Sequence, residues 1–119
     1  MRKVTCDNLI VTCMDFRIQE RIADYAKGNL NGQYDYISFP GATKSLELIL
    51  EQIELAVSLH QVRRILLIHH EDCGAYGATG SLDRHRHDLK IARCEIEKRY
   101  PEMLVELLYV PLEGALIPL

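Results

Sequence analysis

The sequence has neither an excess of positive charge nor a long apolar run. Its 17 aspartates and glutamates outnumber its 14 lysines and arginines, which gives a net charge of −3. Because a nucleic-acid-binding surface normally shows as a basic patch, we expect no nucleic-acid partner. No apolar run approaches the roughly 20 residues of a membrane-spanning helix, so we also expect no association with a membrane.

Features of a secreted protein are lacking as well. The N-terminus is basic, but the apolar segment after it is too short for a signal-peptide core and runs into Asp15 and Arg17. We therefore expect a cytoplasmic protein whose four cysteines remain reduced. In that compartment, cysteines more often bind a metal or catalyse a reaction than form disulfides.

No repeat, linker or low-complexity segment divides the chain. Its 119 residues are the length of one domain, and 48% apolar with 26% charged residues is ordinary for a soluble globular protein. We expect a single domain over residues 1–119.

Strand and helix patterns alternate along the chain. Apolar, β-branched runs predict strands, and apolar residues at helical spacing predict helices. The strands are predicted at residues 8–13, 34–39, 62–69 and 104–110, and the helices at residues 18–27, 46–60 and 82–100. Gly28 is suited to end the first helix, and Thr43 or Ser45 to cap the second. The apolar tail, residues 111–119, is left unassigned.

This alternation is typical of a parallel α/β sheet. Right-handed crossovers place helices on both faces, so we predict a doubly wound α/β domain with a mainly parallel sheet of about four strands. With the strand order 2-1-3-4, the first and third strands are neighbours. In such sheets, ligands bind beyond the carboxyl ends of the strands, at the point where the strand order reverses.

The carboxyl ends of those two strands carry residues that favour zinc. His70 and Cys73 follow the third strand as His-x-x-Cys, and Cys13 ends the first strand. Zinc prefers imidazole nitrogen and thiolate sulfur. A lone cysteine is more often a small core residue, but the shared position of these three predicts a Zn²⁺ site. The other cysteines, Cys6 and Cys94, match no motif and are expected to be structural.

Asp15 and Arg17 alternate with Cys13 along the chain and are open to two interpretations. One is a surface ion pair. The other is a carboxylate that can reach the metal and an arginine that can hold it away from the metal.

Together these segments resemble the β-class carbonic anhydrases, whose hallmark is Cys-x-Asp-x-Arg followed later by His-x-x-Cys-Gly. The two motifs here are Cys13-Asp15-Arg17 and His70-Cys73-Gly74, and His70 follows Cys13 by 57 residues. The resemblance implies a zinc-binding domain of this family, with its α/β sheet, over residues 1–119.

The resemblance also implies residue roles and a reaction. Cys13, His70 and Cys73 would hold Zn²⁺, and Asp15 would be a fourth ligand in a resting form. Paired with Arg17, Asp15 would instead orient a zinc-bound water, which makes both residues catalytic. The implied reaction is the reversible hydration of carbon dioxide to bicarbonate by a zinc-bound hydroxide, in a homodimer or a higher homo-oligomer.

Two alternatives within the same fold stay open. One is a zinc hydrolase acting on carbonyl sulfide or carbon disulfide, and the other is a non-catalytic zinc-binding protein. Where the family usually has Arg-Asn-Ala-Gly, this chain has Ser38-Phe39-Pro40-Gly41, and Phe16 stands where a small residue is common. Only 12 residues precede Cys13, so we expect no N-terminal helical extension that embraces a partner subunit.

The remaining histidines are expected to lie outside the metal site. His69 should point to the opposite face of its strand from the metal ligand, where we expect it to be packed or hydrogen-bonded. A role behind the metal, or as a proton shuttle, is left open for it. His85 and His87 do not share a helix face, so we interpret them, with Arg84 and Arg86, as a solvated surface.

Two further kinds of site are excluded. The glycines after the metal motif, Gly74, Gly77 and Gly80, match neither the dinucleotide fingerprint nor Walker A. Gly74 is better explained as the sharp exit from the metal loop. A cysteine phosphatase would place an arginine six residues after its cysteine, whereas those positions hold Gln19 and Thr79.

The tail has too few polar residues for a solvated end. Its large apolar residues are Leu112, Leu116, Ile117 and Leu119. Because a small domain rarely leaves such a patch open, we expect a homodimer.

Overall fold

The computed structural model describes residues 3–119, which form a five-stranded sheet in the order β2-β1-β3-β4-β5. The strands are β1 (Asn8–Thr12), β2 (Asp35–Ser38), β3 (Arg64–His70), β4 (Leu104–Val110) and β5 (Ile117–Pro118). Strands β1 to β4 run parallel to one another, and β5 is antiparallel to β4. The predicted order 2-1-3-4 is confirmed, and the tail adds a fifth strand.

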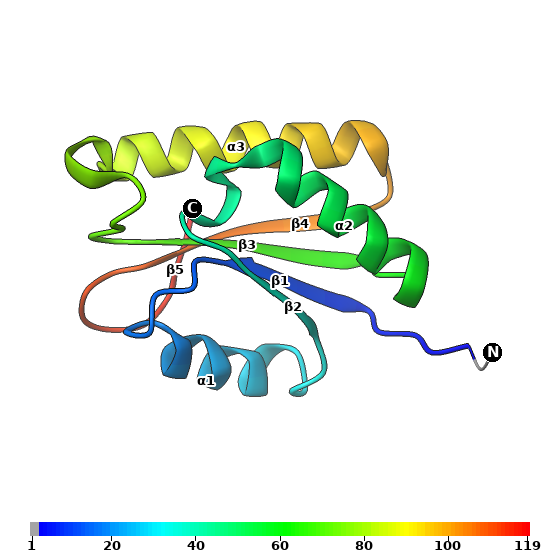
Figure 1. Ribbon diagram of the computed structural model, residues 1–119. Coiled ribbons are helices and arrows are strands. Elements are labelled where there is room, and N and C mark those ends of the chain that lie inside the picture. Colours follow the sequence, from blue (N-terminus) through cyan, green and yellow to red (C-terminus); the bar gives the residue numbers. More distant parts are fainter. Residues whose placement is uncertain (1–2) are drawn as a thin grey trace.

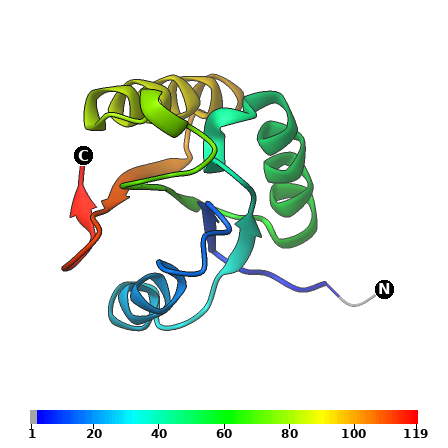
Figure 2. The ribbon, with the colours of Figure 1, turned by 60° about the vertical axis from the view of Figure 1, so that its left-hand side comes forward.

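Helices cover both faces of the sheet, as predicted. They are α1 (Gln19–Asn29), α2 (Leu46–His60) and α3 (Leu82–Arg99), with the short 3-10 turns η1 (Ala42–Lys44) and η2 (Gly77–Thr79). Figures 1 and 2 show α1 on one face and α2 and α3 together on the other. The fold is therefore the doubly wound α/β arrangement that alternating strands and helices predict.

The central strand β3 is buried on both faces. Ile65 and Leu67 belong to the core under α2 and α3, whereas Leu66 and Ile68 belong to the core over α1. Successive side chains of a strand alternate between its faces. His69, the next residue, therefore continues the α2–α3 side of the sheet.

The tail pairs with the edge of the sheet. Ile117 lies opposite Tyr109 of β4, and the N–H of Leu119 donates to the carbonyl of Leu107 at 3.0 Å. Leu116 and Leu119 pack against the two cores. Part of the apolar tail is thus covered within the chain, since an edge strand offers it unpaired backbone groups.

The predicted end of the first helix is wrong. Helix α1 continues through Gly28 to Asn29, and the chain turns instead at Asn31 and Gly32, which have φ angles of 53° and 71°. Both residue types tolerate this left-handed conformation, so the turn forms one helical turn later than predicted.

Helix α2 starts and ends where predicted, but its capping contact differs from the prediction. Ser45 does precede the helix, but its side chain makes no capping hydrogen bond. Thr43 is not a cap either, because its hydroxyl lies 2.7 Å from Nε2 of His69. This tertiary hydrogen bond takes the place of a local capping contact.

Within residues 3–119, no helix combines the length and apolar character needed to cross a membrane.

Candidate functional site

Strand order brings three potential metal donors together. Cys13 directly follows β1, His70 is the last residue of β3, and Cys73 lies three residues further on. Because β1 and β3 are parallel neighbours, their carboxyl ends meet at one edge of the sheet. The Sγ atoms of Cys13 and Cys73 and a ring nitrogen of His70 all lie within 4.8 Å of one another.

The three donors are buried, and one of them is left unpaired. Cys13, His70 and Cys73 are 6%, 1% and 4% exposed. Nδ1 of His70 lies 2.8 Å from the carbonyl oxygen of Glu71, which can only accept, so Nδ1 carries the ring proton. Nε2 has no hydrogen-bond partner among the residues that the structure describes. Its lone pair is therefore available to a metal.

A sharp turn returns the chain from His70 to Cys73. Asp72 adopts the left-handed conformation, with a φ of 58°. Gly74 does not adopt this conformation, but it lies in the next turn, at the exit from the metal loop where it was predicted. After the turn, the N–H groups of Tyr76 and Gly77 donate to the carbonyl of Cys73 at 3.0 and 3.2 Å, which fixes the loop behind the ligand.

The two thiols have different surroundings. Burial raises the pKa of the Cys13 thiol, but in the metal-free chain the protonated form of His70 and the N–H of Gly41, which lies 3.4 Å from Sγ, outweigh burial and bring the pKa down to about 7. Burial and the nearby Cys13 raise the pKa of Cys73. Cys13 is therefore the more readily ionised thiol, as expected for a cysteine that binds a metal.

Asp15 is held by Arg17 beside this group. Its carboxylate accepts hydrogen bonds from the Arg17 side chain, the shortest at 2.7 Å, and from the Arg17 backbone N–H at 2.8 Å. The paired guanidinium lowers the pKa of Asp15 to about 2, so the carboxylate is ionised at neutral pH. Oδ2 of Asp15 lies 4.0 Å from Nε2 of His70.

Arg17 is also anchored to the second motif. Its NH1 and NH2 groups donate to the side chain and the carbonyl of Asp72, each at 3.0 Å. The arginine therefore ties the segment after β1 to the turn after β3. Of the two interpretations of Asp15 and Arg17, an isolated surface pair does not describe this geometry.

A glutamine that sequence reasoning missed supports the segment after β1. Nε2 of Gln19 donates to the carbonyls of Cys13 and Asp15 at 3.1 and 2.8 Å. The hydroxyl of Tyr36 donates to Oε1 of Gln19, and burial raises the pKa of Tyr36 to about 12, so the phenol stays protonated. These contacts join α1 and β2 to the loop, and no local pattern would have revealed them.

The donor set fits a tetrahedral zinc ion. Two sulfurs bound to one zinc at about 2.3 Å lie about 3.8 Å apart in tetrahedral geometry. The Sγ atoms of Cys13 and Cys73 are 4.0 Å apart. With the unpaired Nε2 of His70, the site offers two sulfurs and one nitrogen, a ligand set that zinc favours.

His69 lies behind the site on the other face of β3, as predicted. Its Nε2 lies 2.7 Å from Oγ1 of Thr43, and its Nδ1 lies 2.7 Å from Nδ1 of His85. Burial, together with the nearby His85, lowers the pKa of His69 to about 3. His69 is therefore neutral at physiological pH.

The interpretation of His85 as a surface residue is wrong. His85 is fully buried, whereas His87 is exposed. The physical reason is that His85 shares the buried face of α3 with Leu89, Ala92 and Ile96. This spacing was visible in the sequence. The other two cysteines lie outside the metal cluster, Cys6 partly buried and Cys94 exposed.

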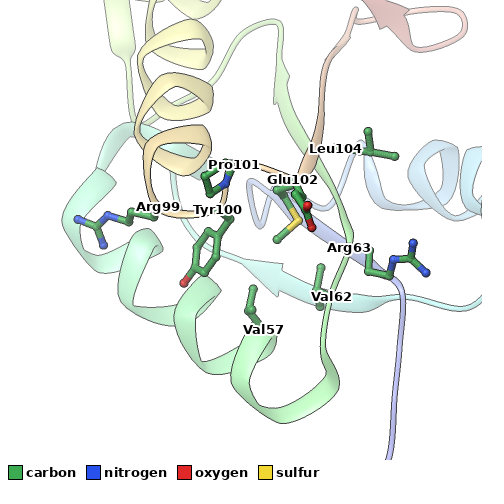
Figure 3. A pocket seen from close by; sticks show the side chains of 9 residues that line it. Val57, Val62, Arg63, Arg99, Tyr100, Pro101, Glu102 and Leu104 are labelled. Atoms are coloured by element: carbon green, nitrogen blue, oxygen red, sulfur yellow. The ribbon is translucent and has the colours of Figure 1, made fainter.

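A pocket of about 770 Å³ lies at the opposite end of the sheet (Figure 3). It is lined by residues between α2 and β3 and between α3 and β4, including Arg63, Arg99 and Tyr100. None of the three metal donors lines it. The chemistry of the donors, rather than the size of a hollow, therefore locates the candidate site.

Comparison with known proteins decides the family. The family described as "Putative carbonic anhydrase" matches this chain over residues 3–117. The chain belongs to this family. An uncharacterised protein of Rickettsia bellii is 27% identical, in a match that covers 91% of this chain and 78% of that protein.

Solved carbonic anhydrases share the fold. The carbonic anhydrase from Glaciozyma antarctica matches with a TM-score of 0.70 at 18% identity, over 99% of this chain and 84% of that one. The β-carbonic anhydrase isoform I from Trichomonas vaginalis matches with a TM-score of 0.63 at 16% identity, over the same shares of the two chains. The predicted resemblance to β-class carbonic anhydrases is confirmed.

The structure explains why a glycine is needed at Gly41, the position after β2 that matches the Arg-Asn-Ala-Gly motif of the carbonic anhydrase family. Gly41 has a φ of 78°, and a Cβ there would come within 3.0 Å of Cβ of Ala75 and 3.2 Å of Cβ of Lys44. Only glycine fits this turn without strain. Met14 and Phe16, the neighbours of Asp15 in the sequence, are 62% and 86% exposed.

Proposed function

We propose that this protein catalyses the zinc-dependent, reversible hydration of carbon dioxide to bicarbonate. Membership of the carbonic anhydrase family supports the proposal. The observation that carries it is the buried group of Cys13, His70 and Cys73, with the Asp15–Arg17 pair beside it. These five residues would form the reaction centre.

The three buried donors would hold the metal. Two thiolates balance the charge of Zn²⁺, and neutral His70 adds a nitrogen without further charge. The carbonyl of Glu71 accepts the Nδ1 proton of His70, so Nε2 keeps its lone pair for the metal. Zinc, when bound, supplies Lewis-acid chemistry that makes water a nucleophile near neutral pH.

Asp15 would orient the attacking water. Since its pKa is lowered to about 2, the carboxylate accepts a hydrogen bond and does not donate one. Arg17 holds it with several N–H donors and is itself tied to Asp72. Oδ2 of Asp15 lies 4.0 Å from Nε2 of His70, so the acceptor borders the position of the metal. A fixed acceptor at this distance restricts the direction from which water attacks.

A related zinc hydrolase is the second candidate. Ser38-Phe39-Pro40 in place of the family's usual Arg-Asn-Ala, and Phe16 in place of a small residue, change the residues around the site and motivate a different linear substrate such as carbonyl sulfide or carbon disulfide. The residues would play the same roles, because such substrates also present an electrophilic carbon to water.

Three measurements on the purified full chain test these proposals. Metal analysis should find about one zinc per chain. Stopped-flow assays should show carbon dioxide hydration that Cys73→Ser abolishes and Cys94→Ser leaves unchanged. Sulfide release without carbon dioxide hydration would favour the second candidate. Bound zinc with neither activity would favour a non-catalytic zinc protein.

A further inference from the structure

Strand β3 presents adjacent histidines to opposite faces of the sheet. His70 belongs to the metal cluster, whereas His69 is 1% exposed on the α2–α3 side. There it contacts Thr43 of η1 and His85 of α3. The proposed reaction does not use His69, Thr43 or His85. Buried polar groups are costly unless they are hydrogen-bonded, so the contacts that satisfy them constrain the local structure.

The hydrogen bonds define where the proton of His69 lies. The backbone N–H of Thr43 donates to Nε2 of His69 at 3.4 Å, and the Thr43 hydroxyl lies 2.7 Å from the same atom. Nε2 is therefore the acceptor, and the neutral ring carries its proton on Nδ1. Nδ1 in turn donates to Nδ1 of His85 at 2.7 Å. His69 thus accepts from η1 and donates to α3.

The η1 turn needs such support. Gly41 and Ala42 have successive positive φ angles of 78° and 52°. For alanine this conformation costs free energy and persists only where surrounding contacts hold it. Within the turn, the Ala42 N–H donates to the carbonyl of Phe39 at 2.9 Å and the Lys44 N–H to the carbonyl of Gly41 at 3.0 Å. Other elements hold η1 through the bond from Thr43 to His69 and the bond from Nζ of Lys44 to the carbonyl of Ala75 at 2.6 Å.

The turn delivers a donor to a metal ligand. The Gly41 N–H donates to Sγ of Cys13 at 3.4 Å. The direction of this N–H depends on the backbone of the turn, and Thr43 lies only two residues further along. Hydrogen bonds behind a ligand fix its orientation and tune its donor strength.

We propose that His69 is a positioning residue for the metal centre: through Thr43 it holds η1 so that the Gly41 N–H donates to the Cys13 thiolate. The inference rests on the proposed zinc site and adds a role for residues on the far face of β3. Groups of this kind change metal affinity by about 10–100-fold when they are removed.

The test uses the full chain loaded with zinc or cobalt(II). Thr43→Val removes the hydroxyl while keeping the shape of the side chain, and Thr43→Ser keeps the hydroxyl. Ser45→Ala is the matched control, because the exposed Ser45 side chain makes no capping hydrogen bond. Zinc affinity is measured by chelator competition. The thiolate-to-cobalt charge-transfer band reports the hydrogen bond to sulfur, since an N–H donor lowers the energy of the sulfur lone pairs.

Thr43→Val should bind zinc about tenfold more weakly and should move the charge-transfer band to longer wavelength. Thr43→Ser and Ser45→Ala should keep the affinity and band of the original protein. If Thr43→Val does not fold, Thr43→Ala removes the hydroxyl without adding a methyl group and should show the same changes.

If Thr43→Val or Thr43→Ala folds and keeps both the zinc affinity and the charge-transfer band, the positioning role of His69 is overturned, whereas the zinc site itself still stands. A weaker affinity with an unchanged band would overturn the positioning role too, because a purely structural loss does not alter the donor to sulfur. If the unsubstituted protein itself shows no thiolate-to-cobalt band, the zinc centre fails and this inference fails with it.

Discussion

Arg17 holds the carboxylate of Asp15 from both its side chain and its backbone. The guanidinium nitrogens lie 2.7 to 3.2 Å from the carboxylate oxygens, and the Arg17 backbone N–H lies 2.8 Å from Oδ1. The same arginine reaches Asp72 in the turn before Cys73. One cation therefore connects the two motifs that carry the proposed metal ligands.

Removing the arginine should separate metal binding from activity. In Arg17→Ala, Asp15 loses the partner that holds it and can occupy the metal's remaining position, so zinc should be retained. Carbon dioxide hydration should fall by about 100-fold or more, the scale expected when the group that orients a reactant is misplaced. Stopped-flow rates and zinc content are measured on the same samples.

Arg86→Ala is the control for Arg17→Ala, because among residues 3–119 Arg86 makes only a surface pair with Asp83 at 3.2 Å. It should keep full activity. An Arg17→Ala protein with full zinc and an unchanged rate would show that the Asp15–Arg17 pair is structural.

The zinc content should depend on the thiols of Cys13 and Cys73 and not on that of Cys94. Cys13→Ser or Cys73→Ser should lose most of the bound zinc, because a serine hydroxyl is a far weaker ligand than a thiolate. Cys94→Ser should lose none, since Cys94 is exposed and lies outside the cluster. Elemental analysis after dialysis checks this. Full occupancy in the double variant Cys13→Ser/Cys73→Ser would contradict the ligand assignment.

Acid should destabilise the fold partly through His85. Burial lowers the pKa of this histidine in the folded chain. As the pH falls below 6.5, the unfolded chain takes up a proton that the folded chain does not, so the free energy of unfolding decreases. His69, Tyr76 and Tyr109 pack against His85, and the charged groups that act on its pKa are His70 on β3 and Asp88 and Arg84 on its own helix.

Urea unfolding between pH 7.5 and 5 measures this effect. Each proton bound only by the unfolded chain contributes a slope of about 1.4 kcal/mol per pH unit. His85→Gln should reduce the slope by up to one proton, whereas His87→Gln, at an exposed position, should not. Equal slopes in the two variants would contradict the prediction.

Substituting alanine for two of the glycines should change the stability of the fold in opposite directions. A Cβ at Gly80 would come within 2.9 Å of Cβ of Tyr76 and 3.4 Å of Nε2 of His85, so Gly80→Ala should destabilise the fold by about 1–3 kcal/mol. Gly28 lies inside α1 with nothing within 4 Å, so Gly28→Ala should stabilise it by about 0.5–1 kcal/mol. Thermal and urea unfolding compare the two variants, and a neutral Gly80→Ala would refute the crowding.

The chain is predicted to form a homodimer. Although Leu116 and Leu119 pack within the chain, Leu112 and Ile117 remain 52% and 45% exposed on the tail. A second copy would cover this apolar edge. Sedimentation across a wide concentration range is the measurement, and a monomer at every concentration would rule the dimer out.

Much of the fold and the metal cluster could be predicted from the sequence, because their signals are local. Alternating strands and helices determine a parallel sheet, and in that topology the residues after the first and third strands share one edge. Cys13, His70 and Cys73 meet there for this reason, and His69 takes the opposite face because side chains alternate along a strand.

The supporting contacts were decided by the tertiary structure. Gln19 meets Tyr36, and His69 meets both Thr43 and His85, only after separate elements have packed together. The short strand β5 likewise depends on the open edge of β4, which exists only in the assembled sheet. Residue types and spacing specify which groups can bind a metal. The hydrogen bonds that orient those groups come from segments far apart in the chain, and their geometry follows from packing alone.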